Sequence, residues 1–203
     1  MQKAAVLTEA LPYIQDFCGS TVLVKVGGSV MESEANLNSL LADIAFMDAV
    51  GMKVVLVHGG GKAISKALTE SGIAPKFVDG LRVTDGPSME IVRRTLNNVV
   101  NADLVKRLQQ LKANARPVHG NWMFTAEKIT SPDRGFVGEP VAADLRIVSE
   151  MMDAGILPVV TPLGTGVDGQ LYNVNADSAA AFLAKELKVR KFAVVSEIGR
   201  AHV

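Results

Sequence analysis

The chain has 203 residues, of which 48% are hydrophobic and 21% are charged, a balance that is typical of a folded globular domain and excludes a disordered tail or a disulfide scaffold. Its 21 basic and 21 acidic residues leave no formal net charge, whereas nucleic-acid binding favours a basic excess that displaces counterions from phosphates. The single cysteine, Cys18, suits a reducing compartment, and no run reaches the ~18 apolar residues of a membrane helix, so we expect a cytoplasmic protein without nucleic-acid or membrane partners.

Short β-branched runs alternate with longer amphipathic stretches along the chain. Strands are expected at residues 21–26, 53–57, 156–160, 171–174 and 191–195, with short strands and turns over 116–137. Helices are expected over residues 34–50, 63–71, 87–111, 145–152 and 176–187. Near-continuous apolar strands are typical of parallel sheets that are covered on both faces. The alternation therefore predicts an α/β fold, a three-layer αβα sandwich around a mainly parallel central sheet.

Two glycine clusters directly follow the first two predicted strands. Gly27-Gly28 comes after Lys25-Val26, and Gly59-Gly60-Gly61 comes after His58. In open α/β sheets ligands bind at the carboxyl ends of the strands, where glycines let backbone N–H groups approach an anion. Tight turns without a ligand would explain one such cluster, but two clusters in adjacent βα units favour an anion-binding site.

Two further glycine motifs match known cofactor loops only in part. Gly61-Lys62 resembles the end of a phosphate-binding P-loop, but the first glycine of that loop would fall at Leu56, and Ala63 replaces the hydroxyl residue that binds magnesium. Residues 164–169 match G-x-G-x-x-G, yet a strand pattern follows them and Asp168-Gly169 is a hairpin signal. We therefore expect neither a P-loop nor a dinucleotide site.

Three polar side chains are candidates for this site, and each also has a purely structural alternative. Lys25 ends an apolar strand beside the first glycine cluster, where a buried ammonium favours an anionic partner, although a solvated edge lysine is the alternative. Asp177 begins a helix, which helix capping or dipole pairing would also explain. Arg82 lies in a GLRVT segment and suits bidentate carboxylate binding, unless it is a surface charge. His58 and His119 have no Ser, Cys or acidic partner at a recognisable spacing and are expected to be structural.

Several segments, taken in order, resemble the amino-acid kinase family. They are residues 25–28 (KVGG), 57–61 (VHGGG), 77–84 (FVDGLRVT), 135–138 (GFVG), 155–160 (GILPVV) and 173–177 (NVNAD). The resemblance covers the chain up to about residue 194 and implies the amino-acid kinase fold. The combination of VHGGG with GLRVT and NVNAD is specific, whereas the lysine and glycine motif alone would place only the wider family.

The resemblance implies an activity, a cofactor and substrates. The reaction would be ATP-dependent phosphorylation of the γ-carboxylate of N-acetyl-L-glutamate, the second step of arginine biosynthesis. ATP would be used with Mg²⁺ that is held mainly by the phosphates, and no side chains are expected to form a dedicated metal site. The alternatives are an aminoadipate-type or glutamate-type kinase, or an inactive fragment that only binds the acyl amino acid. Detectable ATP binding would favour a kinase over such a fragment.

The resemblance also implies roles for individual residues. Lys25 would stabilise charge on the transferring phosphoryl group, and Asp177 would orient Lys25, so these two form the catalytic pair. The remaining binding groups would be the backbone amides of Gly27 and Gly28 for phosphate, those of Gly60 and Gly61 for the substrate, and the side chains of Arg82 and Asn173 for its α-carboxylate.

The same resemblance predicts how the chain is organised. Residues 1–177 would form the amino-acid-substrate lobe, with an N-terminal helix and the central sheet, and residues 178–203 would begin an ATP-binding lobe. The family continues beyond this length with most of its nucleotide site and a second catalytic lysine, so we expect an incomplete nucleotide lobe, a non-native tail at about residues 194–203, and no kinase activity. Residues 4–14 resemble the extra helix of hexameric members, and the full-length protein is expected to be a homo-oligomer, a dimer or a hexamer.

Overall fold

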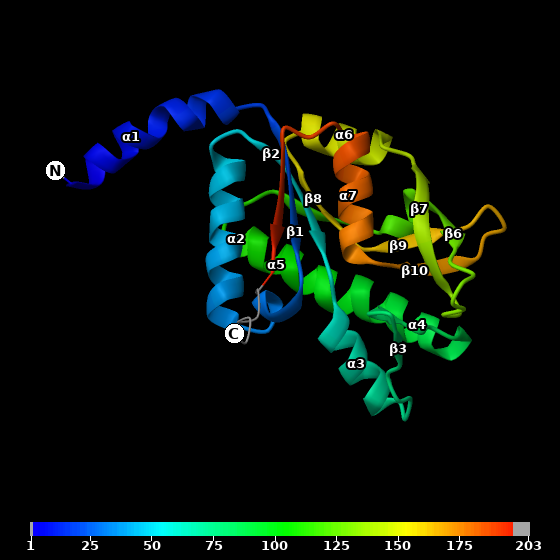
Figure 1. Cartoon of the computed structure of the whole chain (residues 1–203). Helices are drawn as coiled ribbons and strands as arrows, with labels where there is room; N and C mark the ends of the chain where they lie inside the picture. Colours follow the sequence, from blue (N-terminus) through cyan, green and yellow to red (C-terminus); the bar gives the residue numbers. More distant parts are fainter. Residues whose placement is uncertain (1, 197–203) are drawn as a thin grey trace, which may run out of the picture.

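The computed structural model describes residues 2–196 and has a parallel sheet at its centre (Figure 1). The strands of this sheet run in the order β11-β1-β2-β8-β5, and each neighbouring pair is parallel. They are β1 Thr21–Val26, β2 Lys53–His58, β5 Ala115–Val118, β8 Leu157–Val160 and β11 Lys191–Val195. The apolar runs predicted as strands at 21–26, 53–57, 156–160 and 191–195 all lie in this sheet.

Helices form at each amphipathic stretch of the sequence. They are α1 Gln2–Phe17, α2 Glu34–Ala49, α3 Gly61–Glu70, α4 Gly86–Arg94, α5 Ala102–Gln110, α6 Arg146–Asp153 and α7 Ala176–Glu186. Side-chain oxygens of Ser33, Asp85 and Asn175 cap α2, α4 and α7, which satisfies backbone N–H groups that a helix start leaves free. The helix predicted over 87–111 is continuous, but a π-helical turn, Thr95–Asn101, separates α4 from α5.

Two apolar layers form because successive side chains of a strand point to opposite faces. One face of the central sheet, including Val24 and Leu56, packs against α2 and α5. The other face, including Leu23 and Val55, packs against α6 and α7. The three-layer αβα sandwich is therefore confirmed. Lys25 is two residues after Leu23, so it lies on the side of the sheet that α7 covers.

A second, smaller sheet closes on itself beside the central one. Its strands are β6 Phe124–Lys128, β7 Val137–Ala143, β9 Leu163–Thr165 and β10 Leu171–Val174. β9 and β10 are antiparallel, and Gly169 in the turn between them has a φ of 81°. The prediction that no helix opens after the glycines of residues 164–169 is confirmed. A hairpin of β3 Phe77–Val78 and β4 Leu81–Arg82 was not expected, because two-residue strands carry no periodic pattern.

The structure of the two chain ends tests only some of the predictions about domain organisation. α1 forms at the predicted N-terminal helix and extends away from the sheet (Figure 1). α7 and β11 pack on the central sheet together with earlier elements, and the division after residue 177 stays a prediction. Most of the tail predicted at about 194–203 lies outside the described residues. Within residues 2–196, no helix is both long and apolar enough to cross a membrane.

Candidate active site

All eight predicted site residues line one cavity of about 220 Å³ at the carboxyl ends of β1 and β2. The cavity arises from strand register, since Val26 is paired with His58 and both glycine clusters therefore leave the sheet at the same level. Gly59 N donates to Val26 O over 2.8 Å, which joins the two loops. The structure brings together Lys25, Gly27, Gly28, Gly60, Gly61, Arg82, Asn173 and Asp177.

Lys25 and Asp177 form an ion pair on this cavity. The distance from Lys25 Nζ to Asp177 Oδ1 is 2.8 Å, and only 8% of the Lys25 side chain is exposed, against 62% of Asp177. Asp177 lies in the first turn of α7, where Asn175 Oδ1 accepts hydrogen bonds from the backbone N–H groups of Asp177 and Ser178. The helix start thus fixes the carboxylate, and the carboxylate gives the buried ammonium the counter-charge that it needs.

The first glycine loop leaves room for the lysine. A Cβ atom at Gly27 would lie 2.8 Å from Lys25 Nζ, so any larger residue there would displace the ammonium group. Gly28 has a φ of 59°, a left-handed conformation that glycine adopts with little cost. The lysine and its loop therefore depend on these two glycines in different ways.

The second glycine loop leads into α3 and places the N-terminus of this helix at the cavity. Gly60 is the N-cap residue of α3 and makes no side-chain cap hydrogen bond, so the first N–H groups of the helix have no capping side chain. A Cβ atom at Gly60 would lie 2.8 Å from Leu96 Cδ2, which shows how closely the loop packs on the π-helical turn. Backbone donors and the positive end of the helix dipole thus face the cavity together.

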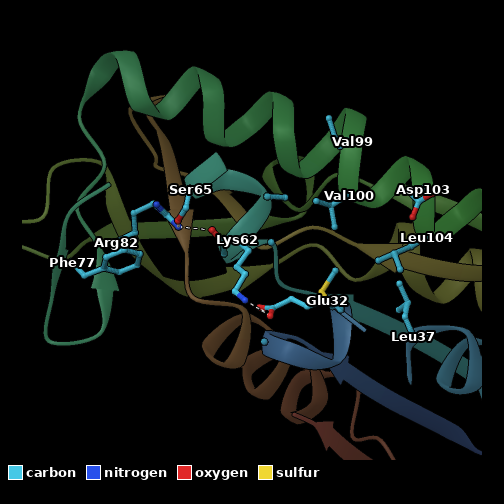
Figure 2. Close-up of a pocket in the computed structure, with 15 residues that line it drawn as sticks. Glu32, Leu37, Lys62, Ser65, Phe77, Arg82, Val99, Val100, Asp103 and Leu104 are labelled. Carbon is cyan, nitrogen blue, oxygen red and sulfur yellow. Dashed lines mark hydrogen bonds and ion pairs between the residues drawn. The ribbon is translucent and has the colours of Figure 1, made fainter. Parts of the chain in front are cut away.

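Arg82 presents an unpaired donor in a buried position. Its Nη2 donates to Gly61 O over 2.7 Å and to Ser65 Oγ over 2.8 Å, and its guanidinium lies 4.7 Å from the Phe77 ring centroid. Nη1 is buried and has no hydrogen-bond partner within the described residues, and burial lowers the pKa of Arg82 below its ordinary value. Figure 2 shows Arg82 beside Phe77 and Ser65. A buried, unpaired guanidinium nitrogen fits an anionic oxygen of a ligand.

Asn173 links the cavity to the segment that carries Arg82. It lies on β10, and its Nδ2 donates to Thr84 Oγ1 over 3.2 Å. Thr84 is fully buried and follows Arg82 by two residues. The amide oxygen of Asn173 can accept from a ligand while its nitrogen holds Thr84, so the residue suits both binding and support.

Sequence reasoning missed Arg134, which supports the β3–β4 hairpin. Arg134 Nε donates to Val78 O over 3.1 Å, and Nη2 donates to Asp79 Oδ2 over 2.8 Å. Only 6% of the Arg134 side chain is exposed. Its neighbour Gly135 packs against the segment that follows the hairpin, where a Cβ atom on Gly135 would lie 2.2 Å from Thr84 O. The sequence does show an arginine before a glycine in a segment rich in turns. It does not show which residues that arginine contacts.

A larger cavity of about 570 Å³ adjoins the first and shares Gly28, Gly60, Gly61, Phe77 and Arg82 with it. Its other lining is largely apolar and comes from the 3-10 turn after β1 and the residue that follows it, α2, α3, the π-helical turn and α5 (Figure 2). Lys62 forms an ion pair with Glu32 on this lining. No sequence motif predicted this second cavity.

Comparison with known proteins identifies the family. A sequence model described as the amino acid kinase family matches residues 20–199. The chain belongs to the amino acid kinase family. An acetylglutamate kinase from Thermoanaerobacter sp. (strain X514) is 43% identical over 200 residues, which make up 97% of this chain and 67% of that relative. This member of the family thus spans about two thirds of the length of that relative.

Solved structures confirm the amino acid kinase fold. N-acetylglutamate synthase from Neisseria gonorrhoeae, complexed with coenzyme A and N-acetyl-glutamate, has a TM-score of 0.81 and 28% identity, over 95% of this chain and 45% of that one. Carbamate kinase from Giardia lamblia bound to AMP-PNP has a TM-score of 0.64 and 15% identity, over 89% of this chain and 72% of that one. The second similarity shows the fold alone. The family and fold expectations from sequence are both confirmed.

Proposed function

We propose that this amino acid kinase phosphorylates the γ-carboxylate of N-acetyl-L-glutamate with ATP, the second step of arginine biosynthesis. The observation that carries the proposal is that two buried cations, Lys25 and Arg82, share one cavity with both glycine loops. A substrate with two carboxylates that reacts with a triphosphate needs such cations and backbone donors. The 43% identical acetylglutamate kinase supports this choice of substrate over an aminoadipate-type or glutamate-type kinase.

The reaction requires positioning more than covalent participation by the protein. A γ-carboxylate oxygen of the substrate attacks the γ-phosphorus of ATP, one P–O bond forms, and the bond to the ADP oxygen breaks, which yields an acyl phosphate and ADP. The nucleophile already carries its negative charge, so no protein base is needed. Lys25 stabilises the charge of the transferring phosphoryl group, Asp177 positions Lys25, and Arg82 with Asn173 holds the α-carboxylate.

In this arrangement Mg²⁺ would be bound by the phosphates of ATP and not by a set of protein side chains. Bound Mg²⁺ neutralises phosphate charge during phosphoryl transfer. Within residues 2–196, no group of three His, Cys, Asp or Glu side chains could hold a metal ion. Asp177 is the acidic side chain on the 220 Å³ cavity, and Lys25 already engages it. We therefore assign the main Mg²⁺ ligands to the phosphate oxygens.

A substrate panel tests the proposal on a version of the protein that is extended to the length of the 43% identical relative, because the 203-residue chain is expected to lack kinase activity. Acyl phosphate trapped with hydroxylamine is measured with N-acetyl-L-glutamate, L-glutamate or N-acetyl-L-2-aminoadipate as acceptor, each with ATP and Mg²⁺. We expect kcat/KM for N-acetyl-L-glutamate to exceed the others by at least about tenfold, because unpaired buried groups penalise a wrong ligand. A preference for either other acceptor would contradict the proposal. Binding of N-acetyl-L-glutamate without turnover would favour the alternative of a binding fragment.

The proposal includes two features of organisation. The substrate site lies in a lobe that ends near residue 177, and the full-length protein assembles as a dimer or a hexamer. Light scattering coupled to size-exclusion chromatography measures the second directly. A purely monomeric protein at assay concentration would contradict this part of the proposal while leaving the substrate assignment intact.

A further inference from the structure

His58 lies beside the active-site loop but not on the cavity. It is the last residue of β2 and is fully buried, and Gly59-Gly60-Gly61 follows it directly. Its Nδ1 lies 2.8 Å from Gly59 O, and its Nε2 lies 3.0 Å from Asn101 Nδ2. Both polar ring nitrogens of this buried side chain are therefore paired, as buried polar atoms require.

The contacts of Asn101 determine which ring nitrogen carries the proton. Asn101 Nδ2 also lies 2.8 Å from Val159 O. A carbonyl oxygen only accepts hydrogen bonds, so the amide nitrogen and not the amide oxygen must face Val159. The same nitrogen then donates to His58 Nε2, which must be unprotonated. The His58 ring is therefore neutral, with its proton on Nδ1, and Nδ1–H donates to Gly59 O.

The hydrogen bond to Gly59 O orients the next peptide N–H. In a trans peptide the carbonyl and the N–H lie in one plane and point in opposite directions, and the peptide between Gly59 and Gly60 is trans. When His58 holds the Gly59 carbonyl toward itself, the Gly60 N–H must point away from His58. Gly60 lines the cavity, and its N–H donates to no other described residue.

We infer that His58, held by Asn101, is a positioning residue that aims the Gly60 N–H at a carboxylate oxygen of the bound acyl amino acid. The inference rests on the proposed function, whose substrate supplies that oxygen. It also gives a role to the π-helical turn Thr95–Asn101, because this turn ends at the residue that fixes the His58 tautomer. Such turns are frequent at functional sites.

Two substitutions at His58 separate the two hydrogen bonds. In His58→Asn the side-chain amide nitrogen takes the place of Nδ1, so the donor to Gly59 O is kept and the contact with Asn101 is lost. In His58→Gln the amide reaches the place of Nε2, so the contact with Asn101 is kept and the donor to Gly59 O is lost. Both variants lose the ring, so both lower the Tm, and each serves as the control for the other.

The expected result is a difference in affinity that stability does not explain. Calorimetry should show that His58→Gln weakens N-acetyl-L-glutamate binding about tenfold, as expected when one hydrogen bond is no longer oriented. His58→Asn should stay within about threefold of the unmodified chain. Equal losses in the two variants, or losses that follow Tm alone, would overturn the inference.

Nuclear magnetic resonance can observe the His58 ring nitrogens and the Gly60 amide directly. In protein labelled with nitrogen-15, the His58 side chain should show the Nδ1–H tautomer at neutral pH, and the Gly60 amide should shift on ligand addition in the unmodified chain and in His58→Asn. An Nε2–H tautomer would overturn the inference. If the unmodified chain did not bind N-acetyl-L-glutamate, the proposed function would fail. The role of His58 would then be tested with inorganic phosphate as the probe. An Nδ1–H tautomer together with a shift of the Gly60 amide would support it, and the absence of either would contradict it.

Discussion

Three structural features of Lys25 bear on its proposed role. It stands in a buried strand, its ammonium group folds over a glycine, and its counter-ion is the exposed carboxylate of Asp177. Burial strengthens the field of the ammonium group, because few water molecules screen it. Under the proposed function, this charge stabilises the transferring phosphoryl group in the transition state.

In the extended, full-length protein we therefore expect Lys25→Ala to lower kcat by about a hundredfold, while the KM values for both substrates change by less than about threefold. Steady-state kinetics of acyl phosphate formation measures this. Lys53→Ala is the matched control, since Lys53 also forms an ion pair, with Asp153, but lies at the other end of β2. A defect of Lys25→Ala that lay wholly in KM would make Lys25 a ground-state binding residue and contradict the catalytic role.

His58 also predicts how stability depends on pH. Burial lowers the pKa of His58 from 6.5 to about 4. Between these values the unfolded chain binds a proton that the folded chain does not, so the free energy of unfolding falls as the pH falls through this window. We expect His58 to account for a loss of about 2–3 kcal/mol between pH 7 and pH 4.5.

Urea denaturation at the two pH values measures this loss. His58→Gln should lose less stability over the same interval, because its side chain does not titrate. The change that remains in the variant reports the carboxylates and His119, whose pKa burial also lowers. An equal pH dependence in both proteins would contradict a buried, neutral His58.

At the scale of elements, the β3–β4 hairpin carries Phe77 and Arg82, but each of its strands has only two residues. Two-residue strands cannot hold a side chain in place without outside support. Arg134 supplies it, with hydrogen bonds to Val78 O and Asp79 Oδ2. The geometry at Arg82 thus depends on a residue that is remote in sequence.

Arg134→Ala should therefore weaken N-acetyl-L-glutamate binding about fivefold to tenfold, although Arg134 does not line either cavity. Calorimetry measures the affinity, and thermal denaturation reports the accompanying loss of stability. Arg93→Ala is the control, since Arg93 pairs with Glu90 on the surface of α4. An Arg134→Ala variant that was less stable but bound the ligand with unchanged affinity would show that the hairpin needs no such support.

Local features of the fold and the site could be predicted from the sequence, whereas contacts between distant residues could not. Buried strands and the glycine clusters were predictable because each is a local run with a local physical cause. The pairing of Arg134 with Asp79 spans 55 residues, and that of Asn101 with His58 spans 43. No periodic pattern records such contacts, so the hairpin support and the orientation of the second glycine loop required the structure. His58 was expected to be structural for the same reason.

At the scale of the whole molecule, β11 is an edge strand of the central sheet. Phe192 and Val194 are 40% and 52% exposed on it. An exposed apolar edge strand is a site for association with another chain. The apolar faces of the other central strands, by contrast, are covered by helices.

We expect the 203-residue chain to associate in a concentration-dependent way, and Phe192→Lys to reduce this association because a charge on an edge strand opposes pairing. Light scattering over a range of concentrations measures the effect. Trp122→Lys is the control, since Trp122 is also exposed but lies outside the strands. Association that Phe192→Lys left unchanged would place the contact elsewhere on the molecule.

The central claim is that one cavity at the ends of β1 and β2 binds an acyl amino acid through Arg82. Calorimetric titration of the chain with N-acetyl-L-glutamate tests this claim most directly, with Arg82→Ala and the surface control Arg146→Ala titrated alongside. We expect one site per chain, a loss of roughly one to two decades of affinity in Arg82→Ala, as for a charged hydrogen bond worth about 1.5–3 kcal/mol, and no loss in Arg146→Ala. No binding by the unmodified chain, or equal binding by Arg82→Ala, would contradict the account.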